Sequence, residues 1–156
     1  MKSEGPAKHF LLVFVLALVG YVVCYPLIEH RRTRNGPWRV TFATGAAGVP
    51  AIVINQPRLG ITNVQISFAA ETVPTTNSPV SLAFGQPKPV PYEVPFGKCV
   101  FMDTTFLPGT VTFQLFGHEI ELLPRVLVID RQEHAWRPDM TIALPRGPTV
   151  PPQARP

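Results

Sequence analysis

Charged residues are scarce in this chain of 156 residues, because Asp, Glu, Lys and Arg together make up only 15% of it. The formal net charge is +4, yet four of the basic residues, Arg31, Arg32, Arg34 and Arg39, directly follow the first apolar stretch. From residue 40 onward, eight basic residues balance eight acidic ones. A nucleic-acid-binding domain needs its positive charge on the folded domain. We therefore expect no nucleic-acid partner.

Cysteine is equally scarce. Cys24 lies inside the apolar stretch and Cys99 lies far downstream, so the two cannot pair and there is no disulfide framework. This usage fits a reducing compartment. Cys99 begins the apolar run Cys99-Val100-Phe101-Met102, which predicts a small buried side chain rather than a nucleophile.

Signatures of catalysis are also missing, since the chain has no G-x-S-x-G motif and no glycine-rich phosphate loop. We expect His118 to be exposed at a hairpin tip and His134 to lie in a polar loop over 130–134. Together with Glu119 and Glu133 they lack the spacing of metal ligands on a shared element. The sequence therefore predicts a non-enzymatic protein with no metal and no cofactor. A hydrolase or metalloenzyme is the least supported alternative.

Charge is absent from residue 10 to residue 28, which read FLLVFVLALVGYVVCYPLI. A helix of this length spans roughly 28 Å, which matches the hydrocarbon core of a bilayer. A cleaved signal peptide would have a shorter apolar run and small residues at its cleavage site. We predict a retained single-pass signal-anchor over 10–28, ending near Pro26, with a flank over 1–9 and a basic linker over 29–37.

The basic residues after the anchor bear on its orientation. Arg31, Arg32, Arg34 and Arg39 are predicted to lie at the membrane interface, where each base gains about 1 kcal/mol near anionic lipid. The positive-inside rule then favours a cytoplasmic domain, with an exported domain as the alternative.

Proline determines the fold class of the remainder. Seventeen of the nineteen prolines follow the anchor, and from Pro37 onward no proline-free interval exceeds about sixteen residues. Proline costs roughly 3 kcal/mol inside a helix, so short strands are left. The predicted strands are 38–43, 51–54, 61–68, 80–84, 98–102, 126–129 and 140–144, with a hairpin over 111–123.

This spacing predicts an all-β domain over 38–145, an antiparallel β-sandwich of immunoglobulin-like architecture, with a β-barrel as the alternative. The proline-rich segment 85–97 favours polyproline II or an edge strand. Residues 146–156 are predicted to be a disordered proline-rich tail.

The hairpin has a predicted register. Gly117 at the first central position suits a type II′ turn, with Gly117 and His118 at the tip. Leu115 would then lie opposite Ile120 and Phe113 opposite Leu122, all on one apolar face. Gln114 would lie opposite Glu121 and Phe116 opposite Glu119 on the other face.

Three aromatic residues, Trp38, Tyr92 and Trp136, are candidates for stacking on a sugar. They support one alternative function, a carbohydrate-binding or cell-envelope-binding module. The favoured prediction is a membrane-anchored, non-enzymatic β-sandwich that acts as a structural or protein-interaction module. Its expected partners are the lipid bilayer and another protein bound through a sheet edge.

Overall fold

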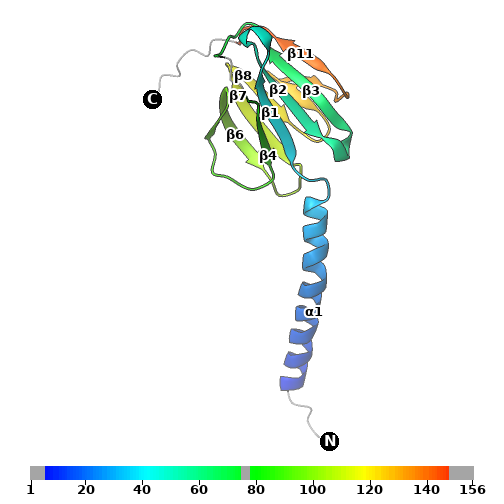
Figure 1. Cartoon of the computed structure of the whole chain (residues 1–156). Helices are drawn as coiled ribbons and strands as arrows, with labels where there is room; N and C mark the ends of the chain where they lie inside the picture. The colour runs from blue at the N-terminus through cyan, green and yellow to red at the C-terminus, as the bar shows by residue number, and fades with distance from the viewer. Residues whose placement is uncertain (1–5, 75–77, 148–156) are drawn as a thin grey trace, which may run out of the picture. The chain divides into compact units, whose positions relative to one another are not determined.

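The computed structural model describes residues 6–74 and 78–147. The chain forms two compact units, Met1–Arg34 and Asn35–Pro156 (Figure 1). The first unit contains one helix, and the second contains all eleven strands of the described residues.

Helix α1 spans Pro6–Thr33, and none of its residues is buried in the structure. It is long and apolar enough to cross a membrane, and it contains the whole predicted anchor. It also continues past Pro26 to Thr33, so the first part of the predicted linker is helical. A helix tolerates proline where the freed backbone groups find other partners, which apolar spanning helices commonly allow. Near its end, Arg32 pairs with Glu29 at 2.8 Å.

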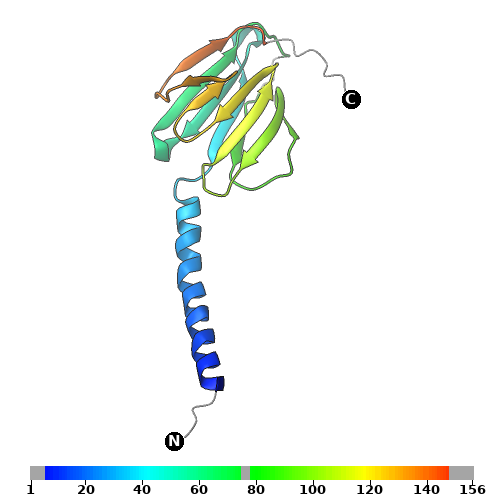
Figure 2. The same cartoon turned by 180° about the vertical axis from the view of Figure 1, so that it is seen from behind.

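The second unit is a sandwich of two sheets (Figures 1 and 2). The first sheet has the order β11 (Thr141–Leu144), β3 (Ile61–Phe68), β2 (Pro50–Gln56), β1 (Trp38–Thr44), β4 (Val80–Phe84). The second has the order β10 (Gln132–His134), β9 (Leu127–Ile129), β8 (His118–Leu122), β7 (Thr110–Leu115), β6 (Gly97–Asp103), β5 (Tyr92–Val94). Two short 3₁₀ helices, Ala46–Gly48 and Pro57–Leu59, connect strands of the first sheet.

All strand pairs are antiparallel except β11 with β3, which is parallel. The prediction of an all-β sandwich is confirmed. The barrel alternative is wrong, because each sheet ends in two edge strands instead of closing on itself.

The core follows the alternation that the sequence shows. On β1, Trp38, Val40 and Phe42 are buried while the residues between them are more exposed. Aromatic rings join the two sheets, since Phe113 on β7 makes edge contacts with Phe42 at 6.2 Å and with Phe84 at 5.1 Å between ring centroids. Such contacts add to the free energy gained by burying apolar area.

The proline-rich segment contributes the edge strand β5, as predicted, and Pro91 and Pro95 flank it. One strand is unexpected, because β10 lies where the sequence predicts a polar loop. It pairs with β9 after a turn at Asp130 and Arg131, whose φ angles are 49° and 68°. Of the predicted tail, residues 148–156 lie outside the described part of the chain.

The hairpin of β7 and β8 forms with a different register from the predicted one. Leu115 lies opposite His118, Phe113 opposite Ile120 and Gln114 opposite Glu119. The tip is Phe116-Gly117, with φ angles of 50° and 83°, and two positive values indicate a type I′ turn rather than type II′. The register differs by two residues, which returns each side chain to the same face. The predicted apolar face is therefore right although its cross-strand partners are wrong.

Candidate functional site

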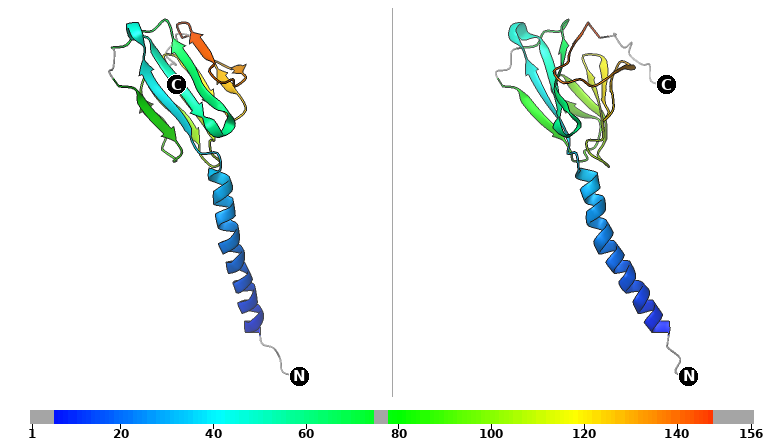
Figure 3. Two further views of the ribbon diagram at one scale, coloured as in Figure 1. Left: turned by 45° about the vertical axis from the view of Figure 1, so that its right-hand side comes forward. Right: turned by 90° about the vertical axis from the view of Figure 1, so that its right-hand side faces the viewer.

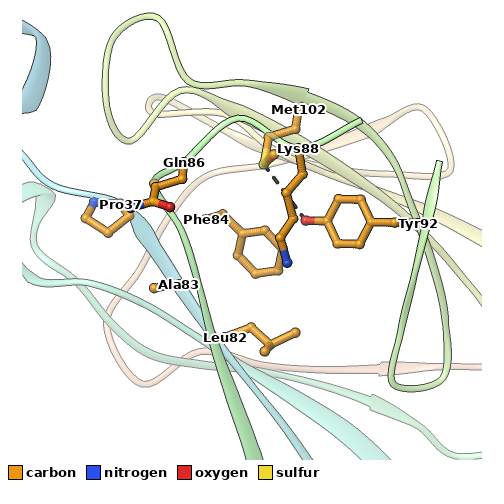
Figure 4. A pocket seen from close by; sticks show the side chains of 9 residues that line it. Pro37, Leu82, Ala83, Phe84, Gln86, Lys88, Tyr92 and Met102 are labelled. Atoms are coloured by element: carbon orange, nitrogen blue, oxygen red, sulfur yellow. Dashed lines mark hydrogen bonds between the residues drawn. The ribbon is translucent and has the colours of Figure 1, made fainter. Parts of the chain in front are cut away.

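A groove with a volume of about 470 Å³ lies at one side of the sandwich, between the edge strand β4 and the strands β5 and β6 (Figure 4). These strands and the segment that joins β4 to β5 supply most of its lining. The lining residues are Pro37, Leu82, Ala83, Phe84, Gly85, Gln86, Lys88, Tyr92 and Met102.

The apolar walls of the groove follow from strand alternation. Val80, Leu82 and Phe84 on β4 lie opposite the buried residues Phe42, Val40 and Trp38 of β1, so they share the inner face of the sheet. Their burial decreases along β4, since Phe84 is 3% exposed, Leu82 is half-buried and Val80 is 41% exposed. No described strand lies beyond β4 to cover this face. The groove is therefore an opening of the apolar core at the edge of the sandwich.

The polar side chains that line the groove are Gln86, Lys88 and Tyr92. The Nζ of Lys88 lies 5.1 Å from the centroid of the Tyr92 ring, which is a cation–π contact. The hydroxyl of Tyr92 donates to Sδ of Met102 at 3.9 Å. Burial raises the pKa of Tyr92, and the Cys99 thiol adds to this shift.

Lys88 has no ion pair among the described residues, and no acidic residue lines the groove. Its side chain extends between Phe84 and Tyr92 (Figure 4). The groove thus combines apolar walls with one uncompensated positive charge.

Strand β4 forms one wall of this groove and is also an edge of its sheet (Figure 3). It pairs only with β1 in the described structure. Its sequence, VSLAF, contains neither charge nor proline. An edge strand presents unpaired backbone N–H and C=O groups, and proteins usually protect such edges with charges, prolines or very short strands.

The three candidate stacking residues are not brought together as one surface. Trp38 is completely buried, its Nε1 donates to the carbonyl of Gly109 at 3.0 Å, and its ring lies 5.4 Å from that of Trp136. Nε1 of Trp136 donates to the carbonyl of Leu123 at 2.9 Å. The stacking assignment is wrong for Trp38, which a ligand cannot reach. Tyr92 lies in the groove, where stacking on a ligand stays a prediction.

His118 differs most from its predicted environment. It is 3% exposed rather than at an exposed tip. Nδ1 lies 2.6 Å from Oδ2 of Asp130 and Nε2 lies 2.9 Å from the carbonyl oxygen of Pro145. The imidazole therefore connects β8 with the turn before β10 and with the end of β11, which is a structural role.

The remaining candidates for chemistry are separate from one another. Cys99 has no exposed surface, as predicted, and burial raises the pKa of its thiol. Among the described residues, no group of three or more His, Cys, Asp and Glu side chains is placed to hold a metal ion. His134 lies on β10 and is half-buried.

The four arginines predicted at the membrane interface occupy different positions. Arg31 and Arg34 are exposed, Arg32 pairs with Glu29, and Arg39 is exposed on β1. Their contact with lipid stays a prediction.

Comparison with the models of known protein families, with curated proteins and with solved structures gave no match for this chain. The groove and the strand beside it are the features of the described structure that bear on its function. Sequence reasoning missed Leu82, Lys88 and Met102 as members of one site. The available signal was an uncharged strand followed directly by a proline-rich segment.

Proposed function

We propose that this chain is a single-pass membrane protein whose β-sandwich binds another protein through the edge of β4, without enzymatic activity. The observation that carries the proposal is an uncharged edge strand with an apolar groove beside it. An extended peptide can add to such an edge, with backbone hydrogen bonds giving affinity and side-chain pockets giving specificity.

The other edge strands are less suited to pairing with a partner strand. Strands β5 and β10 have three residues each and carry charge, including Glu93 on β5, whose carboxylate pairs with Lys98 at 3.6 Å. Strand β11 is uncharged, but it has four residues and none of them lines the groove. The features that protect an edge from pairing are thus present on β5 and β10 and missing on β4.

The membrane part of the proposal is supported by α1, whose 28 residues have a mean hydropathy of 2.6 in the most apolar window. The arginines beyond its apolar region favour a cytoplasmic sandwich by the positive-inside rule. Protease treatment of sealed inside-out and right-side-out vesicles tests this orientation. Cleavage of the sandwich only in right-side-out vesicles would contradict it.

The test of β4 as the binding edge is photocrosslinking of the full chain in its native membrane. Ala83→p-benzoylphenylalanine places the crosslinker at an exposed position on β4, and Thr141→p-benzoylphenylalanine places it at an exposed position on β11 as the matched control. We expect a protein adduct from position 83 that Ser81→Lys abolishes, and no such adduct from position 141. Absence of an adduct at position 83, or equal adducts at both positions, would contradict the proposal.

Tyr92 supports a second candidate function, the binding of a carbohydrate or cell-envelope ligand. Its ring lies in the groove, although Lys88 covers one face of it. A glycan array probed with the full chain in nanodiscs tests this function, with Tyr92→Leu as the control. Retention that depends on Tyr92 would favour it over protein binding, and no retention would remove it.

A further inference from the structure

We infer that the segment bound at β4 is an extended apolar stretch of a partner protein that places an Asp or Glu side chain on the ammonium group of Lys88. The inference rests on the proposed function and specifies the chemistry of the partner. It depends on three features of the groove, namely its unpaired charge, the apolar surroundings of that charge and the spacing of its apolar walls.

The charge of Lys88 is available to a ligand. Lys98 on β6 pairs with Glu93, whereas Lys88, on the segment between β4 and β5, has no acidic partner in the described structure. Its contact with the Tyr92 ring holds the ammonium group at the groove, and an ammonium group has three hydrogen-bond donors to offer. A carboxylate is the group that complements it.

The apolar surroundings make this pairing selective. An ion pair between fully exposed side chains contributes little to binding. Lys88 is itself exposed, but Leu82, Phe84 and Met102 line the same groove, and an apolar occupant would exclude water from it. The attraction between opposite charges grows as the effective dielectric constant falls. An acidic residue in the partner is therefore favoured over a neutral one of the same shape.

The spacing of the walls determines the pattern of the partner. Leu82 and Phe84 are two residues apart on the inner face of β4. An added strand presents every second side chain to the same face. Lys88 lies past the last residue of β4, on the segment that leads to β5. We therefore expect two apolar side chains at alternate positions, with the acidic residue at one end of them.

The experiment uses the full chain in nanodiscs, panned against a displayed library of random peptides of about seven residues, a usual strand length. Empty nanodiscs remove peptides that bind lipid. The enriched peptides are synthesised with acetylated and amidated ends, so that a side chain is their only source of a carboxylate. Their Kd values are measured by fluorescence anisotropy.

We expect the enriched peptides to share the alternating apolar pattern and one acidic residue. Changing that residue to Gln or Lys, or introducing Lys88→Glu into the protein, should each weaken binding about tenfold, and combining the Lys peptide with Lys88→Glu should restore it. Arg58→Glu makes the same charge change at an exposed residue outside the groove and should leave Kd within about twofold.

Three results would overturn the inference. If Ala83→p-benzoylphenylalanine crosslinks the peptides but Kd is insensitive to both charge changes, β4 is the binding edge and the role of Lys88 is wrong. If peptides bind only with a free C-terminal carboxylate, the partner offers its chain end rather than a side chain. If no peptide is enriched over empty nanodiscs, both the inference and the proposed binding edge fail.

Discussion

The imidazole of His118 is a buried polar group with an oxygen partner at each ring nitrogen. These partners are the carboxylate of Asp130 at 2.6 Å and the carbonyl of Pro145 at 2.9 Å. The residue is 3% exposed, so the loss of a partner would leave a buried polar atom unsatisfied, which costs about 1–3 kcal/mol. We therefore predict that changes to Asp130 destabilise the sandwich.

The cost of disturbing this cluster follows from its hydrogen bonds. In Asp130, one carboxylate oxygen is hydrogen-bonded to Nδ1 of His118 and the other accepts from the backbone N–H of Glu119 at 2.9 Å. Asp130→Asn has one oxygen for these two nitrogens and turns an NH₂ group towards one of them. A hydrogen bond to a charged group contributes about 1.5–3 kcal/mol. Because Asp130 is 35% exposed and water can replace part of the loss, we expect destabilisation of about 2 kcal/mol.

Urea unfolding measures this loss directly. The only tryptophans, Trp38 and Trp136, are both in the sandwich, so their fluorescence reports its unfolding in the detergent-solubilised full chain. With a slope of about 2 kcal/mol per molar urea, the midpoint should fall by about 1 M. Glu133→Gln removes the same charge from an exposed residue of β10 and should change stability by less than about 0.5 kcal/mol.

An equal effect of Asp130→Asn and Glu133→Gln on the urea midpoint would refute the reasoning on His118. It would show that the hydrogen bonds of Asp130 do not stabilise the connection between β8 and the turn before β10.

Three further predictions use the same preparation. Gln56 is buried and makes three hydrogen bonds, two to the backbone carbonyls just before β1 and one from a backbone N–H. Gln56→Ala should therefore lower the free energy of unfolding by about 3 kcal/mol. A loss below about 1 kcal/mol would contradict this. Gly109 and Gly60 have φ angles of 67° and 71°, but a Cβ would lie 1.8 Å from a backbone oxygen at Gly109 and has open space at Gly60. Gly109→Ala should therefore be the more destabilising change in urea, and equal losses would exclude the clash. In a Cys24→Ser variant, Cys99 should react with iodoacetamide far more slowly in the folded protein than in urea. The reason is that burial raises the pKa of the Cys99 thiol and lowers its thiolate fraction. Similar rates in both states would show that the thiol is accessible in the folded protein.

The sequence allowed some strands to be predicted residue by residue and others not at all. The bounds predicted for β3 and β4 equal the observed ones, because alternation and flanking turn residues both define these strands. Strand β10 was missed because its three residues, Gln132 to His134, are all polar and show no alternation. The helix was predicted to end near Pro26 because helix propensity includes the cost of an interior proline. Propensity does not include the alternative hydrogen-bond partners that the freed backbone groups can find in an apolar helix.

The hairpin shows a second reason for the differences. The predicted and observed registers place the same side chains on the apolar face, because they differ by two residues. Hydrophobic pattern alone cannot distinguish them. The conformation of Phe116 distinguishes them, since its positive φ places it in the turn, and such a φ is unusual for a bulky residue. The candidate groove was also missed, because it depends on which strand ends a sheet and which strands face it across the sandwich.

Trp38 and Val80 show why alternation predicts the sheet face on which a side chain lies but not how deeply that side chain is buried. Both side chains lie on the inner face of the first sheet, and both belong to strands that the sequence predicts. Trp38 lies opposite Phe84 and is covered by Trp136, so it is completely buried and a ligand cannot stack on it. Val80 lies opposite Phe42 on the last strand of the sheet, and 41% of it is exposed. The burial of such a side chain depends on which residues of the opposite sheet cover it and on whether another strand follows in its own sheet. Both are long-range arrangements. A binding surface on this domain is therefore to be sought where inner-face residues lack cover, and β4 satisfies this condition.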